Sequence, residues 1–291
     1  MKQFNAILMS AILLWLGCDE GTRAPDYDLV VYGGTSAGVA SAIQAARMGK
    51  SVILLEPGKR LGGLTSGGLG QTDIGNKAAI GGISREFYQR IRQYYADTSN
   101  WNWQSPEAYR DGGQTRTQEG EDAMWTFEPS AALKVYEDWM QELQIEVRYD
   151  AWLDRDQGVE KADGKIIAIS LLSGDRFSGS MFIDATYEGD LMAAADISYA
   201  IGREGNEVYD ETLNGVHNKL IDTTMTGHIA RNAFHHNFVD GVDPYVEAGK
   251  PESGLLPFID PEGPGEFGEG DDRVQAYCFR MCLTDHPDNR I

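Results

Sequence analysis

The clearest pattern in the chain runs from Asp28 to Gly63, where short apolar runs alternate with glycine-rich turns. Leu29–Tyr32 has the apolar composition of a buried parallel strand. A glycine turn follows, then a segment with apolar residues at helical spacing, and then a second apolar run, Ser51–Leu55, that ends on Glu56. The helical positions are Val39, Ala42, Ile43 and Ala46. A strand, glycine turn, helix, strand and acid within about thirty residues are typical of a dinucleotide-binding βαβ unit.

Each part of this unit has a physical role in binding a dinucleotide. Gly33 permits a tight turn, and Gly38 lets the helix pack closely against the strand. The N–H groups at the start of the helix, together with the positive end of its dipole, hold a pyrophosphate. The carboxylate of Glu56 accepts hydrogen bonds from an adenosine ribose. The candidate contacts here are Gly33, Gly34, Thr35, Ser36, Ala37, Gly38 and Glu56, with Thr35 standing where the G-x-G-x-x-G pattern has its second glycine.

A second glycine-rich loop, Arg60–Gly70, follows Glu56 closely and indicates which dinucleotide binds. An NAD site needs no such loop here, because its βαβ units simply continue. The order of residues resembles flavoproteins of the glutathione-reductase-like superfamily and, more closely, the bacterial FAD-dependent oxidoreductase family abbreviated FAD_oxidored. Further matching stretches are Trp125–Pro129, Phe182–Leu191 and Asp272–Thr284, so the resemblance covers most of the chain from about residue 27 onward. It implies FAD as cofactor, with contacts from Pro57, Arg60, Gly62, Gly63, Leu64, Thr65 and Ser66.

The patterns that follow predict an α/β fold, a Rossmann-like domain with a parallel sheet and a β-meander. Apolar residues at helical spacing predict a helix from about Gly82, with Ile83, Phe87, Ile91 and Tyr94 on one face, and a helix opened by Glu128-Pro129-Ser130. The buried stripe of the second helix is expected to be Leu133, Tyr136, Trp139, Met140 and Leu143. Ile145–Val147 is expected as the third parallel strand, and a meander over Ala151–Leu153, Lys165–Leu172 and Asp175–Ser180. The resemblance implies that the backbone near Trp152 and Leu153 faces the adenine.

A third signal lies at Met181–Thr186, which reads as a buried strand ending on an acid and small residues. The resemblance implies that the Ala185-Thr186 turn brings main chain close to the FAD. Tyr187 replaces the glycine that usually follows this pair. Gly189-Asp190 is expected to open an alanine-rich helix.

The chain changes character beyond Ile201. Histidines gather at His217, His228, His235 and His236, but their spacing matches no known ligand pattern, and we predict no metal site. Arg280 lies on a segment in which apolar and polar residues alternate, which predicts a strand. Its side chain is a candidate either for clamping substrate or for a structural ion pair. Cys278 and Cys282 share that strand, about 13 Å apart, whereas a disulfide needs less than about 7 Å. We therefore expect free thiols.

Residues 1–18 have the pattern of a bacterial lipoprotein signal peptide. Lys2 precedes an apolar run too short to span a bilayer in the usual way, and the run ends in Leu16-Gly17-Cys18. Cleavage would leave Cys18 as a lipidated first residue. An ordinary signal peptide with a fortuitous cysteine is the alternative. The expected protein is exported, on the periplasmic or surface side of the cell envelope, and touches the membrane only through its lipid anchor.

The expected domain order is signal peptide 1–18, tether 19–27, FAD-binding domain 28–200 and partial substrate domain 201–291. Flavoproteins of this type have a later segment that closes over the flavin, so the chain reads as the N-terminal portion of a longer protein. Its 45 acidic and 25 basic residues give a net charge of −20, which disfavours nucleic acid as a partner.

The implied function is FAD-dependent transfer of a hydride between a small-molecule substrate and the flavin N5. A sugar or polyol is one candidate substrate, and the electron acceptor is unidentified. The alternatives are an NAD(P)-dependent dehydrogenase and a non-catalytic nucleotide-binding lipoprotein.

The lipoprotein hypothesis predicts the behaviour of a Cys18→Ser variant. Without the thiol that carries the lipid, the protein should move from the membrane fraction to the soluble fraction of the envelope or the medium. Fractionation followed by immunoblotting measures this. Unchanged membrane association, with residues 1–17 still attached, would contradict the hypothesis.

Overall fold

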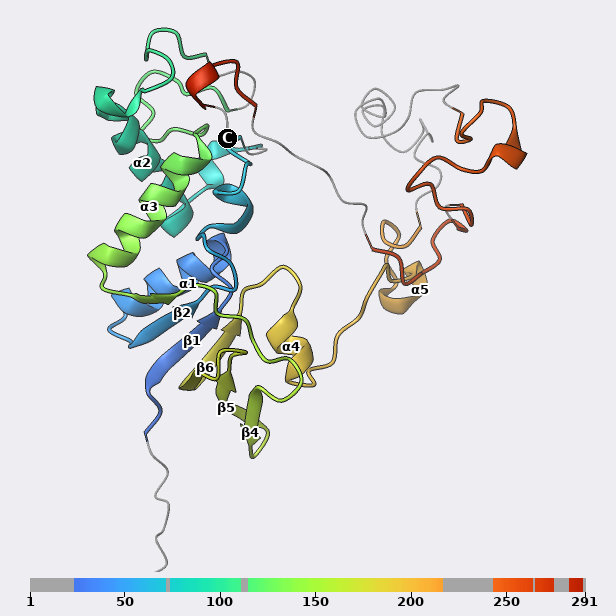
Figure 1. Cartoon of the computed structure of the whole chain (residues 1–291), viewed down its shortest axis with the longest axis horizontal. Helices are drawn as coiled ribbons and strands as arrows, with labels where there is room; N and C mark the ends of the chain where they lie inside the picture. The colour runs from blue at the N-terminus through green and yellow to red at the C-terminus, as the bar shows by residue number, and fades with distance from the viewer. Residues whose placement is uncertain are drawn as a thin grey trace, which may run out of the picture. The chain divides into compact units, whose positions relative to one another are not determined.

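The apolar runs near the start of the chain form the centre of a six-stranded sheet in the computed structural model (Figure 1). The structure describes residues 24–71, 74–110, 115–216, 243–263, 265–274 and 283–289. The strands are β1 (Tyr27–Tyr32), β2 (Val52–Leu55), β3 (Glu146–Arg148), β4 (Val159–Ala162), β5 (Lys165–Ser170) and β6 (Arg176–Asp184). Their order in the sheet is β3-β2-β1-β6-β5-β4.

The sheet is parallel in its first half and antiparallel in its second. β1 pairs in parallel with β2 and β6, and β3 pairs in parallel with β2. β4 and β5 form an antiparallel hairpin that joins β6. The α/β fold with a parallel sheet and a meander is therefore confirmed, as is the third parallel strand.

Two details of the predicted meander are wrong. Asp175–Ser180 and Met181–Thr186 are not two strands: β6 runs unbroken from Arg176 to Asp184, with residues 176–178 against β5 and residues 179–184 against β1. Ala151–Leu153 is not a meander strand, although Leu153 forms an isolated bridge with Leu171. The sequence shows the turn at 173–174. It does not show that one continuous strand changes its neighbour from β5 to β1 along its length. Met181 is also exposed, so β6 is only partly buried.

Helices cover one face of the parallel strands (Figure 1). They are α1 (Ser36–Arg47), α2 (Gly82–Ala96) and α3 (Pro129–Glu142), with the short η1 (Gly63–Thr65), η2 (Lys77–Ala79) and η3 (Thr98–Asn100) between them. α4 (Asp190–Ala194) follows β6, and η7 (Pro287–Asn289) lies near the end of the chain. Among the helices that the structure describes, none has the length and apolar character needed to cross a membrane.

The two faces of β1 and β2 bury alternating residues, as the pleat of a strand requires. Leu29, Val31 and Leu54 pack against the buried faces of α1, α2 and α3. Val30, Tyr32, Ile53 and Leu55 pack on the other face against Leu153, Ile169, Leu171 and Leu191. In α2, Phe87 and Ile91 are buried as expected together with Tyr95, whereas Ile83 and Tyr94 are only partly buried against the same core. In α3, Tyr136, Trp139 and Met140 are buried as expected, whereas Leu133 and Leu143 are only partly buried.

The chain divides into two compact units, Met1–Ile197 with Arg280–Ile291 and Ser198–Phe279. The elements above belong to the first. Within the second, the described residues include α5 (Asn206–Tyr209) and η6 (Pro251–Ser253), and Arg203 is paired with Asp271. The assignment of residues 201–291 to a substrate domain stays a prediction.

The double-sided core predicts a large cost for truncating a central strand. Ile53 is fully buried in β2, so Ile53→Ala should lower the free energy of unfolding by about 2–5 kcal/mol. Ile167 in β5 is 41% exposed, and Ile167→Ala should cost about 1 kcal/mol or less. Denaturant titration of both variants measures the difference. Equal costs would contradict this placement of the core.

Candidate functional site

The candidate site lies where the sheet order reverses. From β1 the chain passes through α1 to β2 on one side, and it returns much later to β6 on the other side of β1. The carboxyl ends of β1 and β6 therefore flank a topological switch point, the usual ligand-binding place in open α/β sheets. The turn after β1, the loop after β2 and the loop after β6 meet at this edge.

The turn after β1 is packed against the loop after β6 with no room for side chains. Gly33 has φ +99°, and a Cβ there would lie 2.7 Å from the backbone nitrogen of Thr186. A Cβ on Gly38 would collide with the carbonyl oxygen of Gly33. Both positions therefore require glycine, for the turn and for the close approach of α1 that the sequence predicts.

Thr35 explains how the turn tolerates a side chain in place of the second glycine of the motif. Thr35 is buried, and its hydroxyl donates a hydrogen bond of 2.7 Å to the carbonyl oxygen of Ala185. The same hydroxyl accepts from the N–H of Gly38 as the N-cap of α1. The side chain points into the protein and joins β1 to β6.

Glu56 ties the end of β2 to the turn. One carboxylate oxygen accepts from the N–H of Gly34 and the other from the N–H of Gly58, each at 2.6 Å. A carboxylate oxygen has a second lone pair, so these bonds leave acceptor capacity for ribose hydroxyls. Glu56 thus holds the turn in place and remains a candidate ribose contact.

The loop after β2 lies beside the first turn of α1. Gly62 has φ +96° and donates its N–H to the carbonyl oxygen of Gly34 at 2.7 Å. The hydroxyl of Ser36 donates to the carbonyl oxygen of Gly62 and is 2.7 Å from the hydroxyl of Thr65. The structure thus brings Ser36 and Thr65 together, which is expected of two residues that contact one ligand.

The ends of this loop are fixed by their own hydrogen bonds. The hydroxyl of Ser66 donates to the carbonyl oxygen of Leu61, and the guanidinium of Arg60 donates to the carbonyl oxygen of Ser66 at 3.3 Å. Pro57 and Arg60 stand at the start of the loop, next to Glu56. Leu64 is exposed, and its N–H donates to the hydroxyl of Tyr187 at 2.9 Å.

The acid that ends β6 shapes the third segment. One oxygen of Asp184 accepts from both the N–H and the hydroxyl of Thr186, and the other accepts from the N–H of Met192 at 2.9 Å. The hydroxyl of Thr186 accepts in turn from the N–H of Gly189. These bonds hold Ala185 and Thr186 against Gly33.

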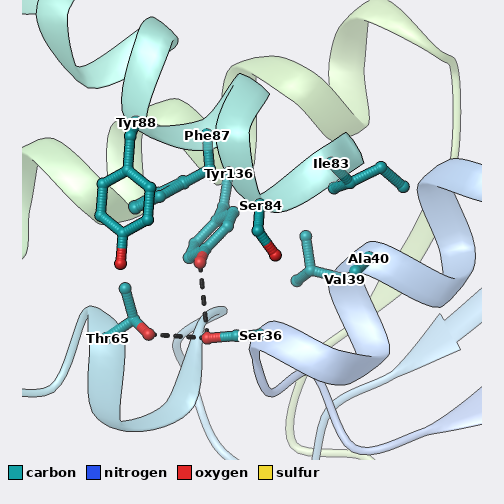
Figure 2. A pocket seen from close by; sticks show the side chains of 9 residues that line it. All are labelled: Ser36, Val39, Ala40, Thr65, Ile83, Ser84, Phe87, Tyr88 and Tyr136. Atoms are coloured by element: carbon teal, nitrogen blue, oxygen red, sulfur yellow. Dashed lines mark hydrogen bonds between the residues drawn. The ribbon is translucent and has the colours of Figure 1, made fainter. Parts of the chain in front are cut away.

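A pocket of about 120 Å³ opens between α1, η1, α2 and α3 (Figure 2). Its apolar wall comes from Val39, Ala40, Ile83, Phe87 and Tyr88, and its polar groups are the hydroxyls of Ser36, Thr65, Ser84 and Tyr136. The hydroxyl of Tyr136 points toward Ser36 and donates to it at 3.4 Å, and Ser36 contacts Thr65 (Figure 2). Burial raises the pKa of Tyr136, so its hydroxyl keeps its proton. The described residues that line the pocket include no charged side chain.

One predicted cofactor contact, Leu153, is not brought to this edge by the contacts that the structure describes. The N–H of Leu153 donates to the hydroxyl of Tyr32, and its side chain lies in the core, so its role near the adenine stays a prediction. Arg280 and Cys18 lie outside the described residues. So do the four clustered histidines and both Cys278 and Cys282. Within the described part of the chain, no group of three or more His, Cys, Asp or Glu side chains is placed to hold a metal ion.

Sequence reasoning missed the parts that Tyr136 and Tyr187 play at this edge. Tyr136 belongs to an apolar stripe, and a stripe does not reveal that one hydroxyl reaches a neighbouring helix. Tyr187 was visible only as a departure from the usual glycine, which was the signal that could have singled it out.

Comparison with proteins of curated function returned no match. Solved structures with a similar arrangement include L-amino acid deaminase from Proteus vulgaris, at 16% identity and a TM-score of 0.41, over 64% of this chain and 55% of that one. L-proline dehydrogenase from P. horikoshii matches at 14% identity and a TM-score of 0.39, over 61% and 58%. The chain spans about half the length of the first solved structures it matches.

The family comparison covers far more of the sequence. The model of one family, described as FAD dependent oxidoreductase, matches residues 28–291, which include every segment of the switch-point site. The chain therefore belongs to the FAD-dependent oxidoreductase family, whose cofactor is FAD.

Proposed function

We propose that this chain binds FAD at the switch point and takes part in the oxidation or reduction of a small-molecule substrate. The observation that carries the proposal is the convergence of three main-chain segments, at Gly33–Gly38, Gly62–Ser66 and Ala185–Thr186, at the carboxyl edge of the sheet. When bound, FAD supplies the redox chemistry by exchanging a hydride with the substrate at its N5 atom.

The residues present fit this cofactor. At Gly33, Gly34, Gly38 and Gly62, an added Cβ would come within 3.0 Å of a neighbouring atom, so the edge is lined by bare main chain. Bare main chain lets a diphosphate approach the N–H groups at the start of α1, which have no partners within the helix. The one bulky replacement in the motif, Thr35, turns its hydroxyl inward to Ala185.

Each segment has a distinct task in this proposal. The first turn of α1 receives the diphosphate, and Glu56 accepts from the adenosine ribose while it holds Gly34 in place. Ser36 and Thr65 offer hydroxyls from two sides. Asp184 fixes the Ala185-Thr186 turn and thereby its position against Gly33.

The pocket beside Ser36 supports an uncharged, hydroxyl-bearing substrate over an anionic one. In the part of the chain that the structure describes, its lining contains hydroxyl and apolar groups and no arginine or lysine that would pair with a carboxylate. A sugar or polyol remains the substrate class that we propose, with an unidentified electron acceptor. We also propose export to the cell envelope and attachment through Cys18.

The glycine packing predicts that Gly38→Ala abolishes flavin retention. The new methyl group collides with the carbonyl oxygen of Gly33, so the turn must open and the diphosphate loses its N–H donors. A matched control is Gly75→Ala, whose Cβ would meet nothing within 4 Å. Both proteins are purified in the presence of FAD, desalted, and their flavin content is measured by absorption. A folded Gly38→Ala protein with one FAD per chain would contradict the placement.

Reduction of the bound cofactor tests the activity itself. The purified protein should show flavin absorption bands, and these should bleach under anaerobic conditions when an oxidisable sugar or polyol is added. Carboxylate substrates such as amino acids serve as the comparison series. Binding of NAD(P) without flavin would favour the dehydrogenase alternative. Binding of nucleotide without any turnover across the panel would favour the non-catalytic one.

A further inference from the structure

Tyr187 links two of the segments that form the cofactor edge. It follows Thr186 directly, and its hydroxyl accepts a hydrogen bond of 2.9 Å from the N–H of Leu64, 123 residues earlier in the chain. The side chain is 61% exposed. The ring therefore lies on the surface of the edge, with its hydroxyl anchored on η1.

Gly63 leaves the space that this contact needs. A Cβ on Gly63 would collide with the hydroxyl oxygen of Tyr187, and the ring carbon that bears this oxygen would be 3.0 Å away. Gly63 also has φ +53°, in the left-handed region. The glycine before Leu64 is thus the residue that lets the tyrosine hydroxyl reach the Leu64 amide.

The anchored hydroxyl has a hydrogen left to donate. A phenol oxygen accepts and donates, and here its acceptor role is filled by the Leu64 N–H. Among the described residues, no oxygen or nitrogen accepts a hydrogen bond from this hydroxyl. Fixing the oxygen on one amide restricts where its O–H can point, and the tyrosine as a whole is exposed.

The position of this donor indicates what it meets. Thr186 lies against Gly33, and Leu64 lies one residue from Thr65, whose hydroxyl contacts Ser36 at the start of α1. The donor therefore stands beside the turn that receives the diphosphate in the proposed function. Hydrogen bonds from a neutral hydroxyl to an anionic oxygen are among the stronger ones in proteins.

We propose that Tyr187 is a cofactor-contacting residue, whose hydroxyl is oriented by the Leu64 amide and donates a hydrogen bond to an oxygen of the FAD diphosphate. This inference rests on the proposed function, because it needs FAD at the switch point. It assigns a role to a tyrosine at the position where the motif usually has glycine.

Tyr187→Phe removes the hydroxyl and keeps the ring. We expect the dissociation constant for FAD to rise by about tenfold, the usual size for the loss of one hydrogen bond to a charged group. ADP carries the diphosphate without the flavin, so its dissociation constant should rise by a similar factor. Fluorescence titration of FAD and calorimetry with ADP give the two values. The matched control is Tyr209→Phe, because Tyr209 is 66% exposed and lies in the other unit.

Hydrogen exchange provides a readout that needs no cofactor. The Leu64 amide should exchange faster in unliganded Tyr187→Phe than in the wild type, with the rest of the βαβ unit unchanged. This result shows that the variant is folded and has lost the intended contact. Unchanged exchange at Leu64 would overturn the proposed anchoring.

A double-mutant cycle tests the link between the two loops. Gly63→Ala pushes a methyl group into the Tyr187 hydroxyl and should weaken FAD binding in the wild type. In a Tyr187→Ala background the same substitution should cost less, because only the backbone strain at position 63 remains. Strictly additive effects would overturn the inference.

The possible failures are distinguishable. A wild-type protein that binds neither FAD nor ADP would overturn the proposed function, and this inference with it. A wild-type protein that binds both, with equal affinities in Tyr187→Phe, would overturn only the role of Tyr187. Weaker FAD binding with unchanged ADP binding would overturn the diphosphate as its target.

Discussion

The close approach of main chain to main chain at the end of β1 is the constraint on which the rest of the site depends. Gly38 can lie against the carbonyl of Gly33, and Gly33 against the amide of Thr186, only because neither has a side chain. This contact sets the distance from α1 to the sheet and from the turn after β1 to the loop after β6. It also leaves the amides at the start of α1 facing an edge that side chains do not fill.

Polar side chains then hold the main chain at this edge in place through hydrogen bonds, and they do not fill the edge themselves. Thr35 bonds to Ala185, Glu56 to Gly34 and Gly58, and Asp184 to Thr186 and Met192. Each is a polar side chain that satisfies main-chain groups at the end of a strand, where the ladder of the sheet no longer pairs them. These two carboxylates and one hydroxyl thus hold in place the loops that follow the strands. A preformed edge loses less conformational freedom when a ligand binds.

Much of this arrangement could be predicted from the sequence, because local patterns specify it. The period of apolar residues gave α1, α2, α3 and the parallel strands, and the glycine turn with Glu56 gave the nucleotide site. The continuous β6 could not be predicted, since its two halves differ only in which strand lies beside them. Nor could the contacts of Tyr136 and Tyr187, because each joins segments about a hundred residues apart through one hydroxyl. Thr35 stands where the motif has its second glycine, and only the structure shows its hydroxyl turned to Ala185.

The central claim is that the three segments at the switch point form one FAD site. Hydrogen exchange of the protein with and without FAD tests this most directly, because it reports which amides the cofactor covers. The account predicts protection at residues 33–38, 62–66 and 185–187 together, with no comparable change in the unit Ser198–Phe279. Protection confined to one of these segments, or centred elsewhere in the chain, would contradict it.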